Sequence, residues 1–385
     1  MYNNITHQYI DRKTGEVKTE HLFKDHVINF IYSRLRENAH FCFNLLISGR
    51  TSSLLGYLTF DFSFSRNRKK AESFIKALNI NMSECLLPQE SFLSARQVFE
   101  RQIKYWRYRP NELDFHESLH DKNCVLSPCD SKMLVGSLKP GTPLFIKEKF
   151  FQYRELLEKE EWLECFKNGE FAIFRLTPDE YHYNHTPVSG KIADFYEING
   201  RYHSCNPGAV VREVTPYSKN QRVVTVINTD VENGSHVGMV AMIEVTAMMI
   251  GRVEQCYSHQ YYDNPSPMHK EMFIKLGQPK SLFRPGSSTV ILMFESDRIV
   301  FSPDIIHNMH RVDAKSRFSG WFGGSLVETS VRVREEIGRT MSPSSHHQTL
   351  THANSFHKYH NLDKPEPKSF SDSLAKITRK SEIRI

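Results

Sequence analysis

Two adjacent serines, Ser287 and Ser288, stand directly before an apolar run that ends at Phe294. Small residues before a β-type run let the backbone turn tightly, so a serine Oγ can approach its own preceding carbonyl. Attack on that carbonyl turns the amide into an ester, and β-elimination followed by hydrolysis leaves a pyruvoyl group at the new N-terminus. A pyruvoyl carbonyl condenses with a substrate amine and withdraws electrons as a carboxylate leaves. The same run is also typical of a simple turn between strands.

Two further segments carry the residue types that such chemistry needs. Asp130 follows a proline-restricted turn after an apolar run, and His182 and His185 stand three residues apart before another proline. Asp, His and Ser can orient an imidazole, accept a hydroxyl proton and attack a carbonyl. Taken singly, Asp130 also fits a turn, and the histidines fit buried polar residues. Because the H-x-x-H pair has no third ligand at useful spacing and no internal Glu, we expect no metal site.

Composition indicates a globular protein. Of the 385 residues, 39% are hydrophobic and 24% charged. No apolar run reaches the ~20 residues of a membrane-spanning helix, and the first residues lack a signal-peptide core, so we expect the protein on the cytosolic side. The seven cysteines show no paired C-x-x-C spacing and are expected to be reduced.

The net charge of +6 suits an anionic partner. Basic residues are dispersed, which favours an acidic membrane face over nucleic acid. Two short basic clusters, at residues 66–70 and 104–109, also fit an ordinary solvated surface.

The elements that must position these residues indicate an α+β protein. Residues 1–110 read as amphipathic helices, with apolar residues at three- and four-residue steps in 21–32, and such a face can pack on a core or lie on a membrane. Residues 111–340 read as short strands of a mainly antiparallel β core, interrupted by a helix at 153–166. Residues 341–385 are polar and His-rich and are expected to be disordered.

In this order, the segments resemble the phosphatidylserine decarboxylase family. Residues 127–130 match its S-P-x-D-G element, residues 181–190 its Y-H-x-x-H-x-P-x-x-G element, and residues 287–291 its G-S-S or G-S-T junction. Supporting similarities lie in the opening segment 9–16, the Y-x-x-N-P segment 202–207 and the closing helix, matched by 331–338. The resemblance runs from about residue 9 to residue 340.

The chain departs from the family pattern at two positions. Ser287 stands where the family has glycine before the cleaved serine, and Ser131 replaces the glycine after Asp130. The Cβ of Ser287 restricts the strained turn, and cleavage before Ser287 is an alternative register. The following strand aligns without a gap only when Ser288 is the cleaved serine.

The resemblance implies self-cleavage between Ser287 and Ser288, which gives a β chain, 1–287, and an α chain, 288–385, that begins with a pyruvoyl group formed from Ser288. Asp130 would orient His185, and His185 would take the Ser288 proton. His182 would protonate the substrate carbon after carbon dioxide leaves.

The implied reaction converts phosphatidylserine to phosphatidylethanolamine and carbon dioxide. The family places such an enzyme at the cytoplasmic face of an anionic membrane as a peripheral protein, with phosphatidylserine and the membrane surface as partners and a homodimer left open. Two alternatives remain: a soluble aromatic amino-acid decarboxylase, of the kind that acts on tryptophan, and an uncleaved, non-catalytic relative locked by Ser287.

Overall fold

The computed structural model describes one compact unit, residues 1–341, with short gaps. The described residues are 6–22, 25–61, 68–110, 123–142, 144–146, 149–213, 215–248, 252–286, 288–321 and 324–341. Ser287, Arg66 and the tail beyond residue 341 lie outside the described residues, so the expectations that concern them are not addressed by the fold. Among the described helices, none combines the length and the apolar character that crossing a bilayer requires.

A ten-stranded sheet forms the centre of the fold, in the order β11-β7-β8-β9-β13-β5-β4-β15-β1-β2. Neighbouring strands run antiparallel except β1 and β15, which are parallel. The strands are β1 (Gln8–Asp11), β2 (Val17–Thr19), β4 (Ser131–Ser137), β5 (Glu170–Leu176), β7 (Gly190–Ile198), β8 (Arg222–Asn228), β9 (Met239–Thr246), β11 (Phe273–Ile274), β13 (Ser288–Phe294) and β15 (Glu328–Val331). Strand β13 is buried at every residue, which explains its unbroken apolar sequence.

Two three-stranded sheets complete the β structure. One is formed by β10 (Val253–Gln255), β12 (Pro279–Phe283) and β6 (Tyr183–His185), and we call it the small sheet. The other is formed by β14 (Ile299–Phe301), β16 (Glu336–Thr340) and β3 (Cys124–Leu126).

Helices surround the large sheet. The N-terminal set comprises α1 (Asp25–Phe30), η1 (Ile31–Leu35), α2 (Arg36–Asn38), α3 (His40–Leu46), α4 (Gly49–Gly56), η2 (Tyr57–Asp61) and α5 (Arg68–Leu78). After it come η3 (Met82–Glu84), η4 (Gln89–Ser91), α6 (Ala95–Phe99) and α7 (Tyr105–Tyr108). The later helices are α8 (Tyr153–Leu157), α9 (Glu160–Cys165), α10 (Pro207–Val210), α11 (Pro216–Lys219), α12 (Pro303–Met309) and η6 (Ser319–Trp321).

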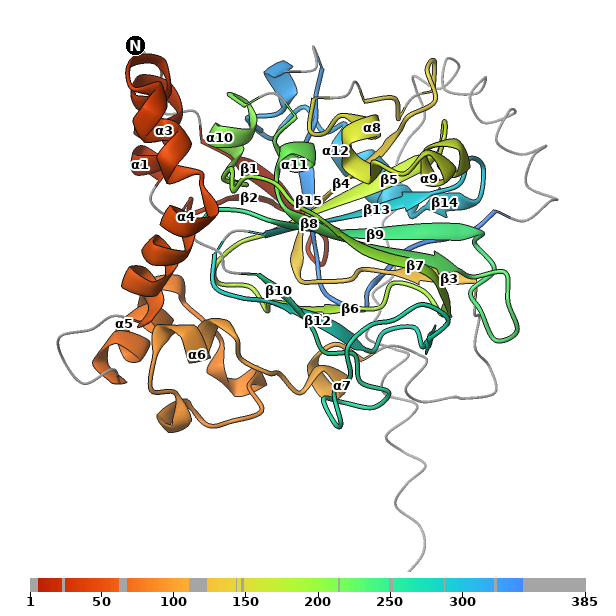
Figure 1. Ribbon diagram of the computed structural model, residues 1–385, viewed down its shortest axis with the longest axis horizontal. Coiled ribbons are helices and arrows are strands. Elements are labelled where there is room, and N and C mark those ends of the chain that lie inside the picture. The colour runs from red at the N-terminus through yellow and green to blue at the C-terminus, as the bar shows by residue number, and fades with distance from the viewer. Residues whose placement is uncertain are drawn as a thin grey trace, which may run out of the picture. The chain divides into compact units, whose positions relative to one another are not determined.

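The layers are visible in Figure 1. The small sheet lies on one side of the large sheet, and α8 and α11 lie on the other, while α1, α3, α4 and α5 line one end. The main hydrophobic core joins the large sheet to apolar side chains of α8, α9 and α12, such as Leu156, Leu163 and Ile305. Strand β13 therefore starts between two packed layers, close to the N-terminal helices.

The predicted α+β class is confirmed, as are the antiparallel strands at 170–176, 222–228, 239–246 and 288–294 and the helical interruption after residue 153. In the region read as mainly helical, the hairpin β1–β2 precedes the first helix. One prediction is wrong: the expected closing helix at 331–338 instead ends β15 and begins β16. Arg334 has a φ of +71°, which no residue inside a right-handed helix adopts.

Candidate active site

Ser288 is the first residue of β13 and lies between two neighbouring strands. It pairs with Leu176 of β5 and with Thr246 of β9. The side chain is fully buried, and within the described part of the chain its Oγ has no hydrogen-bond partner. Most buried hydroxyls are bonded. The open Oγ is therefore consistent with a reactive serine, although the buried hydroxyls of Thr225 and Thr329 also lack a partner among the described residues.

The pleat of the sheets decides which side chains face Ser288. Opposed residues in a sheet share a face, and so do residues two positions apart. Ser288 therefore shares its face with Glu244 of β9, which is opposite Val290. The side chain of Asn184 in β6 donates to Glu244, so this face is the one that looks onto the small sheet.

The same alternation separates the two histidines. Tyr181 and Tyr183 stack on each other, and Tyr181 contacts His185, so these three side chains share one face of their segment. His182 and Asn184 take the opposite face, toward the large sheet. The backbone N–H of Phe283, at the end of β12, donates to the carbonyl of His182, and the chain reaches Ser288 after one short turn. The segment of His182 thus pairs with the end of β12, one short turn before β13.

His182 presents an open nitrogen. Its Nδ1 lies 2.8 Å from the carbonyl oxygen of Glu180, and because a carbonyl only accepts, Nδ1 carries the proton and Nε2 the lone pair. Among the described residues, Nε2 has no partner although it is buried. The ring of Phe99 covers the imidazole at a centroid distance of 3.6 Å. Burial, together with the positive charge of Arg101, lowers the pKa of His182 to about 3, so the ring is neutral.

His185 is bonded at both ring nitrogens. Nδ1 lies 2.9 Å from the carbonyl oxygen of Gly277, and Nε2 lies 2.9 Å from the hydroxyl of Tyr181. Burial lowers the pKa of His185 to about 3. The neutral imidazole therefore donates to Gly277 and accepts from Tyr181, which leaves neither nitrogen open.

Asp130 has different partners from those expected. Its carboxylate accepts from Arg109 at 2.7 and 3.2 Å and from the backbone N–H of Val333 at 2.8 Å. Burial raises the pKa of Asp130, but the Arg109 guanidinium outweighs it and holds the pKa below its usual value. No hydrogen bond joins Asp130 to His185 among the described residues, because Arg109 and Tyr181 hold the two groups. The expected hydrogen-bonded Asp-His-Ser chain is therefore not formed.

The three predicted segments nevertheless meet. The backbone N–H of His185 donates to the carbonyl of Pro128 at 2.7 Å, which sets the Asp130 turn beside β6. Arg109 belongs to the basic cluster at 104–109, for which a solvated surface was one of the two interpretations. Its side chain is only 7% exposed, and it pairs with Glu84 as well as with Asp130. Sequence alone offers no sign of that burial beyond the neighbouring aromatic residues.

A cavity of about 260 Å³ opens beside the junction. Its lining includes Gly286 and Leu176, together with apolar side chains of the N-terminal helices, among them Ile31, Leu46 and Phe60. Phe60 packs on Phe99 at a ring distance of 5.6 Å, and Phe99 covers His182 as described above. The cavity thus adjoins the reactive region and is walled by apolar side chains.

The loop before the junction is fastened by Arg284. Its guanidinium donates to Glu100, which follows α6, at 2.6 Å, and to Glu254 of β10. The same helix α6 carries Phe99, which covers His182. Arg284 therefore links the junction to the support of that imidazole, a role that spacing in the sequence does not reveal.

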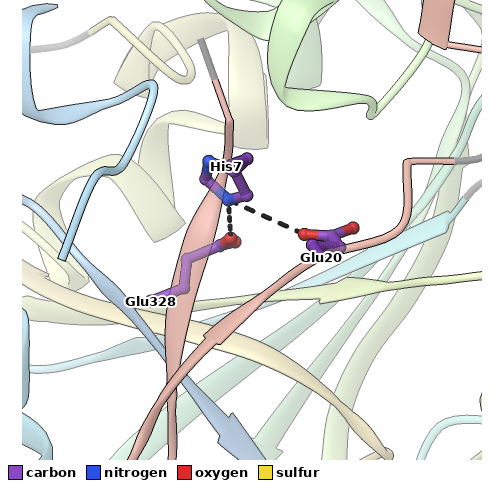
Figure 2. Close-up of side chains that lie close together, drawn as sticks. All are labelled: His7, Glu20 and Glu328. Carbon is purple, nitrogen blue, oxygen red and sulfur yellow. Dashed lines mark hydrogen bonds and ion pairs between the residues drawn. The ribbon is translucent and has the colours of Figure 1, made fainter.

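One cluster of metal-ligand types, which sequence reasoning missed, lies nearby (Figure 2). Nε2 of His7 lies 2.7 Å from Glu328 and 3.7 Å from Glu20. Arg175 donates to both carboxylates, at 2.6–3.0 Å. Burial raises the pKa of Glu328, but Arg175 outweighs it and lowers the pKa to about 2. A guanidinium thus already neutralises the carboxylates, and the cluster is an ion network that fastens the N-terminal strands to β5 and β15.

Comparison with known proteins bears on the whole site. A model of the phosphatidylserine decarboxylase family matches residues 102–318. The phosphatidylserine decarboxylase proenzyme of Fusobacterium nucleatum is 29% identical over 332 residues, covering 86% of this chain and 97% of that protein. The proenzyme of Clostridium tetani is 28% identical over 301 residues, covering 78% of this chain and 91% of that protein. Proenzyme 2 of Oryza sativa is 34% identical over 234 residues, covering 60% of this chain and 34% of that protein.

These matches include the Asp130 turn, both histidines and the serine junction within 102–318. They confirm the resemblance drawn from the motifs. The chain belongs to the phosphatidylserine decarboxylase family.

Proposed function

We propose that the protein decarboxylates phosphatidylserine to phosphatidylethanolamine after cleaving its own chain between Ser287 and Ser288. Family membership supports the reaction, and the relatives' name "proenzyme" supports the processing into two chains. The observation that carries the proposal is the buried Ser288 Oγ, open among the described residues, at the start of the central strand.

The residues fit a pyruvoyl group formed from Ser288. Ser288 Oγ and His182 Nε2 are among the buried polar atoms that have no partner within the described residues, and the alternation of side chains turns both toward the space between the two sheets. Such a group would supply an electrophilic carbonyl and an electron sink for decarboxylation. The neighbouring strands β5 and β9 would hold it rigidly.

For decarboxylation, His182 is the proposed proton carrier. Its Nε2 is buried and open among the described residues, and the ring of Phe99 covers the imidazole. Positioned proton transfer of this kind contributes roughly 10²–10⁴-fold in rate. Because burial favours the neutral ring, His182 would first take a proton at Nε2 from the substrate ammonium and would pass it to the substrate carbon after carbon dioxide leaves.

For maturation, the proposed base is His185, assisted by Asp130. His185 would have to exchange its bond with Tyr181 for one with Ser288, and Asp130 would act through Arg109 and the backbone of Val333. His182 has no such bond to exchange and is the alternative base. Single variants of the two histidines separate these assignments.

For substrate entry, the proposed route is the apolar cavity beside Gly286. The helices that wall it also expose large apolar side chains to solvent, namely Val27, Phe30, Phe41, Leu45, Leu54, Tyr57 and Leu58. An apolar helical surface of this kind binds at the boundary between lipid headgroups and acyl chains. These contacts support a peripheral membrane location, with the acyl chains of the substrate beside the N-terminal helices.

The decisive experiment compares the parent with Ser288→Ala. The parent should run as two fragments on a denaturing gel, with a pyruvoyl mass on the smaller one, and should release carbon dioxide from phosphatidylserine vesicles. Ser288→Ala should give one full-length band and no carbon dioxide. Normal cleavage of Ser288→Ala would exclude this serine as the nucleophile. Carbon dioxide released from tryptophan but not from phosphatidylserine would favour the soluble amino-acid decarboxylase.

A further inference from the structure

A buried polar network connects the small sheet to the strand next to β13. At its centre is Glu244 of β9, whose carboxylate accepts from Lys280 at 2.7 Å, from Gln255 at 2.9 Å and from Asn184 at 3.1 Å. Ser281 also donates to Glu244. These donors come from β12, β10 and β6, so all three strands of the small sheet converge on one carboxylate.

A β-bulge makes this convergence possible. Pro279 pairs with His185 and Ser281 with Asn184, so Lys280 is an extra residue in β12. Consecutive residues in a regular strand point to opposite faces, but a bulge re-aims a side chain. The bulge therefore allows both Lys280 and Ser281 to reach Glu244.

The network lies level with the positions two residues along the chain from each of the reactive residues, Ser288 and His182. Glu244 is opposite Val290, two residues after Ser288, and Asn184 is two residues after His182. The amide nitrogen of Asn184 donates to both Glu244 and Ser281. These bonds fix the segment that carries His182 against the strand pair that carries Ser288.

Stability alone does not account for the network. Both Lys280 and Glu244 have side chains with 0% exposure, and replacing such a buried pair by apolar residues is often neutral or stabilising. What the pair provides, and an apolar contact does not, is a directional link of fixed length between two sheets.

We propose that the network centred on Glu244 is a positioning device that sets His182 at its working distance from residue 288. This inference rests on the proposed function. Glu244, Lys280 and Asn184 are positioning residues, because they act through His182 and do not line the cavity beside Gly286. A displacement of about 1 Å in such a site can cost roughly 10²-fold in rate.

The test shortens the link while keeping its charge. Glu244→Asp retains the pair with Lys280 but withdraws the carboxylate by one methylene. After normalisation to the pyruvoyl content of the smaller fragment, measured by mass spectrometry, kcat on phosphatidylserine vesicles should fall roughly tenfold or more with KM unchanged. Failure to mature, with a melting temperature like that of the parent, would contradict this role, because His182 is proposed to act after cleavage.

Two further variants keep the test decisive. If Glu244→Asp does not fold, the double variant Glu244→Met with Lys280→Met removes both charges and should fold yet show the same loss of kcat. Asp194→Asn is the matched control. Asp194 lies on the outer strand β7, and its buried carboxylate pairs with Lys159. It should lower the melting temperature without lowering kcat.

The outcomes separate this inference from the proposed function. If Glu244→Asp or the double variant matures and turns over like the parent, the network only stabilises the fold and the positioning role is wrong. If the parent itself releases no carbon dioxide from phosphatidylserine, the proposed function fails first. If His182→Ala keeps the parent's kcat, the network has nothing to position and the inference also fails.

Discussion

His182 and His185 differ in what their nitrogens can do, although they stand three residues apart. His182 has an open Nε2 within the described part of the molecule, whereas His185 is bonded to Gly277 and Tyr181. The difference follows from the alternation of side chains along one strand. The two imidazoles therefore have different surroundings, and we expect them to have different roles.

The single variants should show that difference. We expect His182→Ala to cleave but to lose roughly 10²–10⁴-fold in kcat, because proton transfer to the substrate carbon is lost. His185→Ala and Asp130→Ala should accumulate the uncleaved chain on a denaturing gel. If His182→Ala also stays uncleaved while His185→Ala matures, His182 serves both steps and the division of roles is wrong.

For Arg175, the effect of removing the side chain on the stability of the protein, and the change of that effect with pH, can be predicted. Arg175→Met leaves Glu20 and Glu328 buried without their cation, which should destabilise the protein by about 3–5 kcal/mol at pH 7. The two carboxylates would then have raised pKa values, so the deficit should begin to shrink as pH falls through those raised values, and should shrink further below about 4.3, where the parent starts to lose its own ion pairs. Urea unfolding of the parent and the variant at pH 7 and pH 4 measures the loss of stability and its change with pH.

An exposed ion pair provides the control for Arg175. Lys18 pairs with Asp11 at 2.7 Å, and its side chain is 41% exposed. Lys18→Met should cost far less than Arg175→Met, because exposed ion pairs contribute little to stability. Equal losses in the two variants would mean that the buried network contributes no more than a surface pair.

At the scale of elements, α3 presents apolar side chains to solvent. Phe41 is 80% exposed and Leu45 is 52% exposed, while Leu46 of the same helix lines the cavity. Helix α3 therefore joins the proposed membrane surface to the proposed route of the substrate. The basic cluster at 66–70 is described only from the start of α5, where Lys69 is exposed.

Binding to phosphatidylserine vesicles should depend on this helix. Burying a large apolar side chain contributes roughly 1.5–3 kcal/mol, so Phe41→Ser with Leu45→Ser should weaken vesicle binding tenfold or more in a flotation assay. Self-cleavage should be unchanged, because neither side chain lies at Ser288. Val312→Ser is the control, since Val312 is 92% exposed in a turn after α12. Equal weakening by both changes would contradict a specific membrane face.

Which elements the sequence reveals depends on how local their signal is. The strand at 288–294 can be predicted from its unbroken apolar composition. The amphipathic helix near residue 28 can be predicted from the helical period of its apolar residues. The strands β15 and β16 cannot, because each has only four or five residues and no readable period. Only pairing with β4 and β3, distant in sequence, decides their form.

The site, too, could be predicted only in part, because some of its information is local in the sequence and some is not. Ser288, Asp130 and the histidines carry chemical types that motifs record, but their partners come from remote segments. Arg109 and Glu244 are invisible as functional residues until the fold buries one beside Asp130 and the other beneath the small sheet. A residue's type is local information, whereas its hydrogen-bond partner is a property of the topology.

For the whole molecule, buried histidines make stability depend on pH. Burial lowers the pKa of His203 to about 4, below its value of about 6.5 in an unfolded chain. Between these values the unfolded state binds more protons, so this histidine removes stability as pH falls below about 6.5. Its side chain is 4% exposed and takes no part in the proposed chemistry.

His203→Asn isolates that contribution. The difference in unfolding free energy between parent and variant should move in the variant's favour by about 2 kcal/mol from pH 7 to pH 5, since each pH unit is worth roughly 1.4 kcal/mol. Urea unfolding at the two pH values measures the difference, and the other titrating groups cancel. A difference that stays constant with pH would contradict a neutral, buried His203.

The position of β13 between β9 and β5 has a consequence for the life of the protein after it is cut. Cleavage before Ser288 would turn one chain into two, yet the smaller piece would still supply β13 and β15, each flanked on both sides by strands of the larger piece, and β16, which pairs with β3 of the larger piece. The pieces could then separate only by unfolding, and refolding would become an encounter between two molecules. The mature enzyme would behave as an obligate heterodimer whose melting temperature rises with its own concentration, whereas the uncut precursor melts independently of concentration.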